Sequence, residues 1–197
     1  MPYATTYANF IGSIAIPNLV DTKADGQLID TLIEQYENDY LETLLGYDLA
    51  QDVINEITTD AGLLPYVDIV NGATYTDANG DVQKWQGFIA GKSPIANYIY
   101  CEYLRIKEVQ TTGIGSVKQQ SENAILADGT MKLVKAWNDM CAWNMNLHNY
   151  ITSIEATYPV DLEGYIGFKY EPDMNPYTRS GLMPNQLLFV PQNPFSL

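Results

Sequence analysis

The stretch LIDTLIEQYENDYLETLLGYDL, residues 28–49, carries the clearest periodicity in the chain and decides the fold. At about 100° per residue, its apolar side chains gather on one half of a helix and its acidic side chains on the other. The apolar half holds Leu28, Ile29, Leu32, Ile33, Tyr36, Tyr40 and Leu44. The acidic half holds Asp30, Glu34, Glu37, Asn38 and Glu42. The pattern predicts an amphipathic helix with a wide buried face, and Gly46 predicts its end.

Two leucines break this pattern, because Leu41 and Leu45 lie on the acidic side of the helical wheel. One interpretation is that the next segment, residues 47–57, is also helical and covers them. The other is that they face a neighbouring molecule. At the start of the helix, Asp21 or Asp25 is expected to serve as the N-cap.

The charged residues of this region are almost all negative. Residues 21–60 contain eleven Asp and Glu against one base, Lys23, which gives −10 of the chain's formal charge of −14. A nucleic-acid binder needs clustered cations, so direct binding of DNA or RNA is not expected, nor is binding to an anionic membrane. A solvated face is the plain interpretation of such a run. A surface of one sign also suits a position beside an anionic polymer or opposite a basic partner.

Turn and cap residues divide the rest of the chain. Asn79-Gly80 lies between β-prone residues and predicts a hairpin, which places a β-hairpin insertion at about residues 66–86. Ser93 and Pro94 predict the start of a helix over residues 93–109. Residues 111–124 are polar and contain glycine, which is typical of a flexible connector.

The longest helical pattern runs from about residue 128 to 158, and Pro159 is expected to end it. We therefore predict a mainly α protein: a small helical bundle over residues 1–158 with the hairpin insertion, followed by an extended C-terminal tail, residues 159–197. The tail is rich in proline and aromatic residues, and residues 185–191 are typical of a short strand. A segment this apolar is expected to dock on its own domain or on a partner.

A search for catalytic or metal-binding patterns finds little. The only histidine, His148, lies seven residues from Cys141 on one predicted helix, roughly 10 Å apart, too far for a direct hydrogen bond. The sequence DANGD, residues 77–81, lacks the glycine and glutamate that an EF-hand requires at positions occupied by Val82 and Phe88. We predict no catalytic residue, cofactor or metal.

The two cysteines, Cys101 and Cys141, are expected to be free thiols in apolar helices. The N-terminus has no recognisable signal-peptide pattern, and no apolar run is long enough to span a membrane. The expected place of synthesis is a reducing cytoplasm.

Four stretches, read in order, resemble a known family. They are residues 28–57, KWQGFIAGKSPIANYIYCEYLR, TTGIGSVKQQSENA and KAWNDMCAWNMNLHNYI. The first contains Glu-x-x-x-Leu-x-x-Leu-Leu-Gly, formed by Glu37, Leu41, Leu44, Leu45 and Gly46. Over residues 10–158 the chain resembles the head–tail connector (adaptor) proteins of tailed bacteriophages, most of all divergent forms from crAss-like phages of gut bacteria.

The resemblance implies a structural virion protein at the head–tail junction, made in the cytoplasm of the host bacterium and without catalytic activity. Such proteins form a ring, usually dodecameric, that joins the capsid portal protein to the downstream tail or connector protein. The ring extends the channel through which genomic DNA passes without sequence-specific binding. The implied channel-facing residues are Asp30, Glu34, Glu37 and Glu42. The implied partner-binding residues are Leu41, Leu45, Tyr75, Phe168, Tyr170, Tyr177, Phe189 and Phe195.

Two other functions stay open from the residues alone. One is a monomeric interaction module whose acidic face binds a basic protein. The other, less favoured, is a metal-dependent hydrolase that uses carboxylates of residues 21–60.

Overall fold

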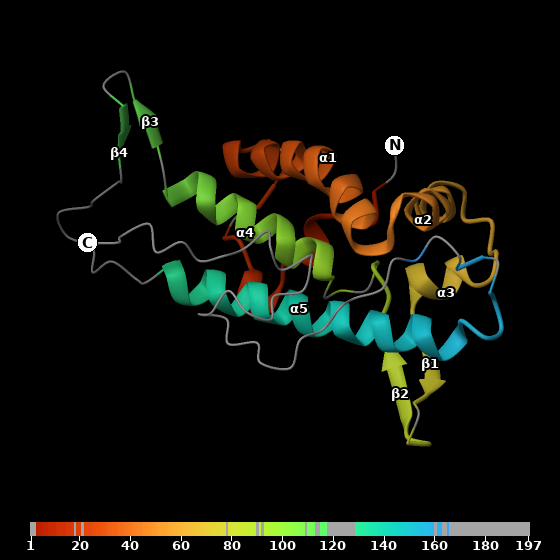
Figure 1. The fold of residues 1–197 in the computed structure, drawn as a ribbon. Coiled ribbons are helices and arrows are strands. Elements are labelled where there is room, and N and C mark those ends of the chain that lie inside the picture. The colour runs from red at the N-terminus through yellow and green to blue at the C-terminus, as the bar shows by residue number, and fades with distance from the viewer. Residues whose placement is uncertain are drawn as a thin grey trace.

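Three long helices form the body of the protein in a computed structural model. They are α1 (Ala24–Leu45), α4 (Pro94–Glu108) and α5 (Gly129–Ile154), and α4 lies between the other two (Figure 1). The structure describes residues 3–17, 19–20, 22–77, 79–89, 91, 93–108, 110–112, 115–117, 129–159, 161–162 and 165. The predicted fold class, mainly α with a β-hairpin, is confirmed.

Helix α1 buries the apolar face that its sequence predicts. Ile29, Leu32 and Tyr40 are all almost completely inaccessible to solvent. The helix ends at Gly46, whose φ of 85° is favourable only for glycine, and α2 (Tyr47–Thr59) begins at the next residue. The predicted cap is wrong, because the N-cap position is occupied by Lys23.

Leu41 and Leu45 are both 0% exposed, so their assignment as partner-binding residues is wrong for the folded chain. Helix α2 turns back from Gly46 and packs against α1. The inner face of α2, including Leu49 and Val53, belongs to the same hydrophobic core. The sequence left two interpretations open, and coverage by the following helix is the correct one.

The insertion combines a short helix with a hairpin. Helix α3 (Tyr66–Asn71) leads into β1 (Ala73–Thr76), which pairs antiparallel with β2 (Val82–Trp85). At the tip, the Asp77 carboxylate accepts hydrogen bonds from the backbone N–H groups of Asn79 and Asp81, each at 2.9 Å. The turn predicted at Asn79-Gly80 is therefore confirmed, and Asp77 closes that turn.

The hairpin is fixed to the helices by aromatic side chains. Trp85 is fully buried and donates a 2.8 Å hydrogen bond from Nε1 to the carbonyl oxygen of Ile69. Tyr75 is only 9% exposed, and its hydroxyl lies 3.1 Å from Oδ1 of Asn146 on α5. The assignment of Tyr75 as a partner-binding residue is therefore wrong, since α5 of the same chain covers it.

A second, smaller hairpin replaces part of the predicted flexible connector. Strands β3 (Gln110–Thr112) and β4 (Gly115–Val117) pair antiparallel beyond the end of α4 (Figure 1). Adjacent β-branched threonines favour an extended backbone, a preference that the polar composition of this segment concealed.

The N-terminal residues cross the helices as an irregular segment with two short 3-10 helices, η1 (Tyr7–Asn9) and η2 (Gly12–Ile14). The segment starts against α1 and reaches α5 at η2 (Figure 1). At the other end, α5 stops at Ile154, before Pro159, and the chain stays against the domain at Leu162 and Tyr165. Residues 166–197, with the tail positions Phe168, Tyr170, Tyr177, Phe189 and Phe195, lie outside the described residues.

Candidate functional site

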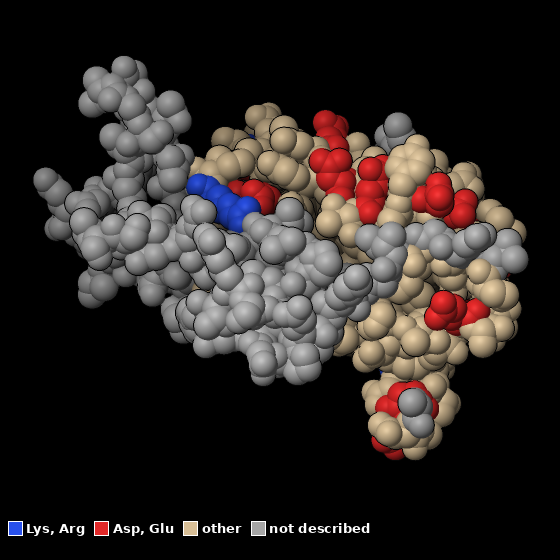
Figure 2. All heavy atoms as spheres, in the orientation of Figure 1, with Lys and Arg blue, Asp and Glu red and all other residues tan. Residues whose placement is uncertain are grey.

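Exposed carboxylates occur along both α1 and α2. Asp30, Glu34, Asp48 and Asp52 are here called the acidic surface. Asp39 is also exposed, but it lies nine residues from Asp30 and therefore on the opposite side of α1. Figure 2 shows acidic groups spread over α1 and α2, whereas the basic groups visible in that view lie over α4. Among the predicted channel residues, Asp30 and Glu34 belong to this surface, and Glu42 beside it is half-buried.

The predicted channel residue Glu37 does not belong to the acidic surface. It is 2% exposed, and its carboxylate accepts hydrogen bonds from the backbone N–H groups of Ala4 at 2.7 Å and Thr5 at 2.9 Å. Burial raises the pKa of Glu37, and the N–H of Ala4 opposes that shift. Its assignment as channel-facing is wrong because the N-terminal segment covers it, a long-range contact that helical periodicity cannot reveal.

Glu56 on α2 has the same role. It is 4% exposed and accepts hydrogen bonds from the backbone N–H groups of Gly62 at 2.8 Å and Leu63 at 3.3 Å. Two of the eleven carboxylates in residues 21–60 therefore hold irregular backbone in place. Neither role has a direct signal in the sequence, since both side chains follow the same acidic pattern as their exposed neighbours.

Several large apolar side chains are exposed where the sequence analysis did not expect them. Tyr47 is 66%, Leu63 54%, Leu64 53% and Val82 77% exposed. They lie on α2, the loop before α3 and the β1–β2 hairpin, at one end of the molecule (Figure 1). These residues, rather than Leu41, Leu45 or Tyr75, are the described candidates for contact with another chain.

The described residues do not form a recognisable catalytic or metal centre. They contain no group of three or more His, Cys, Asp or Glu side chains arranged to hold a metal ion. His148 lies with Nδ1 2.8 Å from the hydroxyl of Tyr165, and burial lowers the pKa of the imidazole. Cys101 and Cys141 are free thiols, as predicted, and burial raises the pKa of Cys101 to about 12.

None of the helices in the described part of the chain is long and apolar enough to cross a membrane.

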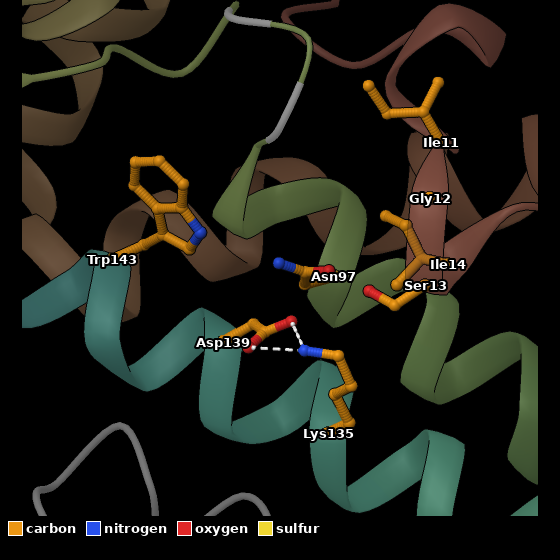
Figure 3. A pocket seen from close by; sticks show the side chains of 8 residues that line it. All are labelled: Ile11, Gly12, Ser13, Ile14, Asn97, Lys135, Asp139 and Trp143. Carbon is orange, nitrogen blue, oxygen red and sulfur yellow. Dashed lines mark hydrogen bonds and ion pairs between the residues drawn. The ribbon is translucent and has the colours of Figure 1, made fainter.

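One cavity of about 410 Å³ opens between η2, α4 and α5. Figure 3 shows polar groups directed into it from all three elements: the hydroxyl of Ser13, the amide of Asn97 and the indole of Trp143. On α5, the ammonium of Lys135 forms an ion pair of 2.9 Å with the carboxylate of Asp139. Ile11 and Ile14 complete the wall with apolar surface. Its residues come from three distant segments of the chain, so no local sequence pattern predicts this cavity.

Comparisons with known proteins do not extend this picture. No protein-family model matches the chain, and no curated protein or solved structure gives a significant match.

Proposed function

We propose that this protein is a structural connector that assembles into a ring between a capsid portal and a phage tail, where it extends the DNA channel. The observation that carries the proposal is the acidic surface, with exposed carboxylates along α1 and α2 and basic side chains elsewhere on the visible face (Figure 2). A resemblance in four ordered sequence stretches supports the same assignment.

The physical argument rests on repulsion. Duplex DNA carries about one negative charge per 1.7 Å of its axis, so a cationic wall would bind the moving genome. A surface that carries carboxylates and no cations repels phosphates over roughly 10 Å at moderate salt. This repulsion keeps DNA from adhering to the wall. We propose that Asp30 and Glu34 face the channel, together with Asp48 and Asp52 on α2.

A ring also needs contacts between subunits. The exposed apolar side chains Tyr47, Leu63, Leu64 and Val82 offer such contacts at one end of the domain. Large exposed apolar residues at interfaces lose their contact with water on assembly, which favours association.

The test is assembly of the full chain with a portal protein encoded beside it. Mass photometry of the mixture should show a complex with a fixed number of copies, and electron microscopy should show a ring below the portal. Replacement of Tyr47 and Val82 by Ser should reduce assembly, whereas Thr43→Ser and Thr74→Ser, at exposed positions on α1 and β1, should not. Absence of any complex with the portal, together with a 1:1 complex with a basic protein, would contradict the proposal.

That second outcome would instead support an acidic interaction module, which the same surface favours by charge complementarity. The metal-dependent hydrolase gains no support from the described residues, in which no three carboxylates of residues 21–60 are grouped so as to hold a metal ion.

A further inference from the structure

We propose that Asn79, in the turn of the β1–β2 hairpin, is a site of spontaneous chemical modification, at which the side-chain amide is lost and the residue becomes aspartate or isoaspartate. We propose further that the fold protects the other Asn-Gly pair of the chain, Asn71-Gly72, from the same reaction. Water is the only co-reactant, and the inference is independent of the connector function.

The reaction needs only the asparagine, the following backbone nitrogen and water. The nitrogen of Gly80 attacks Cγ of Asn79 and forms a bond with it. The bond between Cγ and Nδ2 breaks, and Nδ2 leaves as ammonia with the proton that the Gly80 nitrogen gives up. Water then opens the succinimide ring at either of its carbonyl carbons, which gives aspartate or isoaspartate. Glycine favours the attack because it has no side chain to hinder the approach of its nitrogen.

The chain contains two Asn-Gly pairs, at residues 71–72 and 79–80. Both asparagines are exposed, so access of water does not distinguish the two sites. The glycine nitrogen reaches Cγ only when the backbone of the asparagine rotates toward its own side chain. The freedom of the backbone at each pair therefore decides which of them reacts.

The backbone at Asn71 is held in place. Asn71 is the last residue of α3, and the N–H of Gly72 donates a 2.9 Å hydrogen bond to the carbonyl oxygen of Asp68. Gly87 packs directly on this peptide group, since a Cβ added at Gly87 would lie 2.4 Å from the backbone carbon of Asn71 and 2.6 Å from the nitrogen of Gly72. A Cβ added at Gly72 would lie 2.6 Å from the carbonyl oxygen of Trp85. Rotation at Asn71 therefore requires the base of the hairpin to separate from α3.

The backbone at Asn79 is much less restrained. The hairpin projects away from the helices, and this pair lies in its turn (Figure 1). Its chain neighbours aside, Gly80 has no atom of the described residues within 4 Å of an added Cβ. The N–H of Gly80 donates a 3.0 Å hydrogen bond to the carbonyl oxygen of Asp77, and the N–H of Asn79 donates one of 2.9 Å to the Asp77 carboxylate. Both bonds lie within the exposed turn, and such local structure opens at a small free-energy cost.

The modification changes both the charge and the backbone of the turn. Either product adds a carboxylate between Asp77 and Asp81. Isoaspartate also adds a CH₂ group to the main chain, which disturbs the pairing of Thr76 with Val82 next to the turn. Val82 is 77% exposed, so the reaction alters the part of the hairpin that carries this apolar side chain.

The first experiment compares the two pairs within one folded protein. The full chain is incubated in mildly alkaline buffer, and peptide mass spectrometry with separation of aspartate from isoaspartate follows Asn71 and Asn79. Asn79 should convert at least about tenfold faster than Asn71, because its backbone opens more easily. Equal rates at the two pairs would overturn the proposal.

The second experiment removes the fold and sets the timescale. In guanidinium chloride at the same pH, both pairs should convert at similar rates, because the same dipeptide then has the same freedom. If Asn71 stayed slow in the unfolded chain, its sequence neighbours rather than the packing of Gly87 would protect it, and the proposal would be overturned. The same holds if Asn79 of the folded chain stayed intact over a period at least about a hundred times longer than its conversion in guanidinium chloride.

A third measurement tests the attacking atom. Gly80→Ala places a side chain on the residue whose nitrogen attacks, so conversion of Asn79 in the folded chain should slow by about tenfold or more. A merely looser turn would have the opposite effect, because the alanine strains a backbone with a φ of 88°. The melting temperature checks that the variant is folded. Unchanged or faster conversion in this variant would overturn the proposed reaction.

Discussion

The carboxylate of Glu37 and the backbone N–H of Ala4 form a 2.7 Å hydrogen bond that joins α1 to the start of the chain. With the second bond from Thr5, both carboxylate oxygens are occupied by backbone donors inside a buried contact. An acidic residue inside the hydrophobic core is therefore explained by the irregular segment that packs over it.

Glu37→Gln should destabilise the protein by about 1–3 kcal/mol, because the amide NH₂ group would face one of the two backbone donors and leave it unsatisfied. Urea unfolding followed by circular dichroism measures the change. Glu34→Gln is the matched control on an exposed site of the same helix and should change stability by less than about 0.5 kcal/mol. Equal effects from the two substitutions would contradict the structural role of Glu37.

The same residue predicts a pH dependence. Because its folded-state pKa is raised, mainly by burial, folding favours the protonated carboxyl. Its stabilising contribution is therefore complete below the unfolded pKa, near 4.5, and is lost as the pH rises through the folded pKa. The stability difference between wild type and Glu37→Gln should grow in favour of wild type as the pH falls from 7 toward 4.5. Urea titrations of both proteins across this range check it, since general charge repulsion largely cancels in the difference. A constant difference would show that Glu37 does not titrate in this way.

Tyr40 and Asn144 form a polar contact between α1 and α5 within the core. The Tyr40 hydroxyl donates to Oδ1 of Asn144, whose Nδ2 has no partner among the described residues. Tyr40→Phe should lower the free energy of unfolding by about 1–3 kcal/mol, because it removes the hydroxyl that donates to Oδ1 and leaves the buried Asn144 amide without that hydrogen bond. Tyr36→Phe, half-buried on the same helix, should change the thermal midpoint much less, and a larger effect from that control would count against the contact.

Gly87 occupies a position that only glycine fits. Its φ is 85°, and an added Cβ would lie 2.4 Å from the backbone carbon of Asn71 and 2.5 Å from the carbonyl oxygen of Val70. Gly87→Ala should therefore displace the base of the hairpin and lower the melting temperature substantially. Gly80→Ala, at a similar φ of 88° but with open space around it, should cost only about 1 kcal/mol. Calorimetry measures the melting temperature of both variants. Equal decreases in the two would contradict the importance of the close contact at Gly87.

Leu41→Asp tests the corrected position of this side chain. Because Leu41 is 0% exposed, an aspartate there should prevent cooperative folding or lower stability by several kcal/mol. Thr43→Asp, two residues later and exposed, should be tolerated. A monomeric, fully stable Leu41→Asp protein that fails only in assembly would instead restore Leu41 to an interface.

The sequence alone determined helices α1, α2, α4 and α5 with boundaries within a few residues, the turn at Asn79-Gly80 and the free state of the thiols, but not the short helix α3. These features depend on local rules: apolar periodicity in α1 and α5, glycine at the end of α1, and serine and proline before α4. Local patterns act between neighbours on one element, so they can be read without knowing what packs against that element.

Only the tertiary structure decided which acidic and apolar side chains reach solvent. Glu37 and Glu56 resemble their exposed neighbours in sequence, yet both bind backbone from other segments. Leu41 and Leu45 lie outside the main apolar stripe, yet α2 covers them. The cavity around Asn97 likewise requires η2, α4 and α5 together. Each of these outcomes depends on contacts between residues far apart in the chain, and the periodicity of one helix contains no information about its distant neighbours.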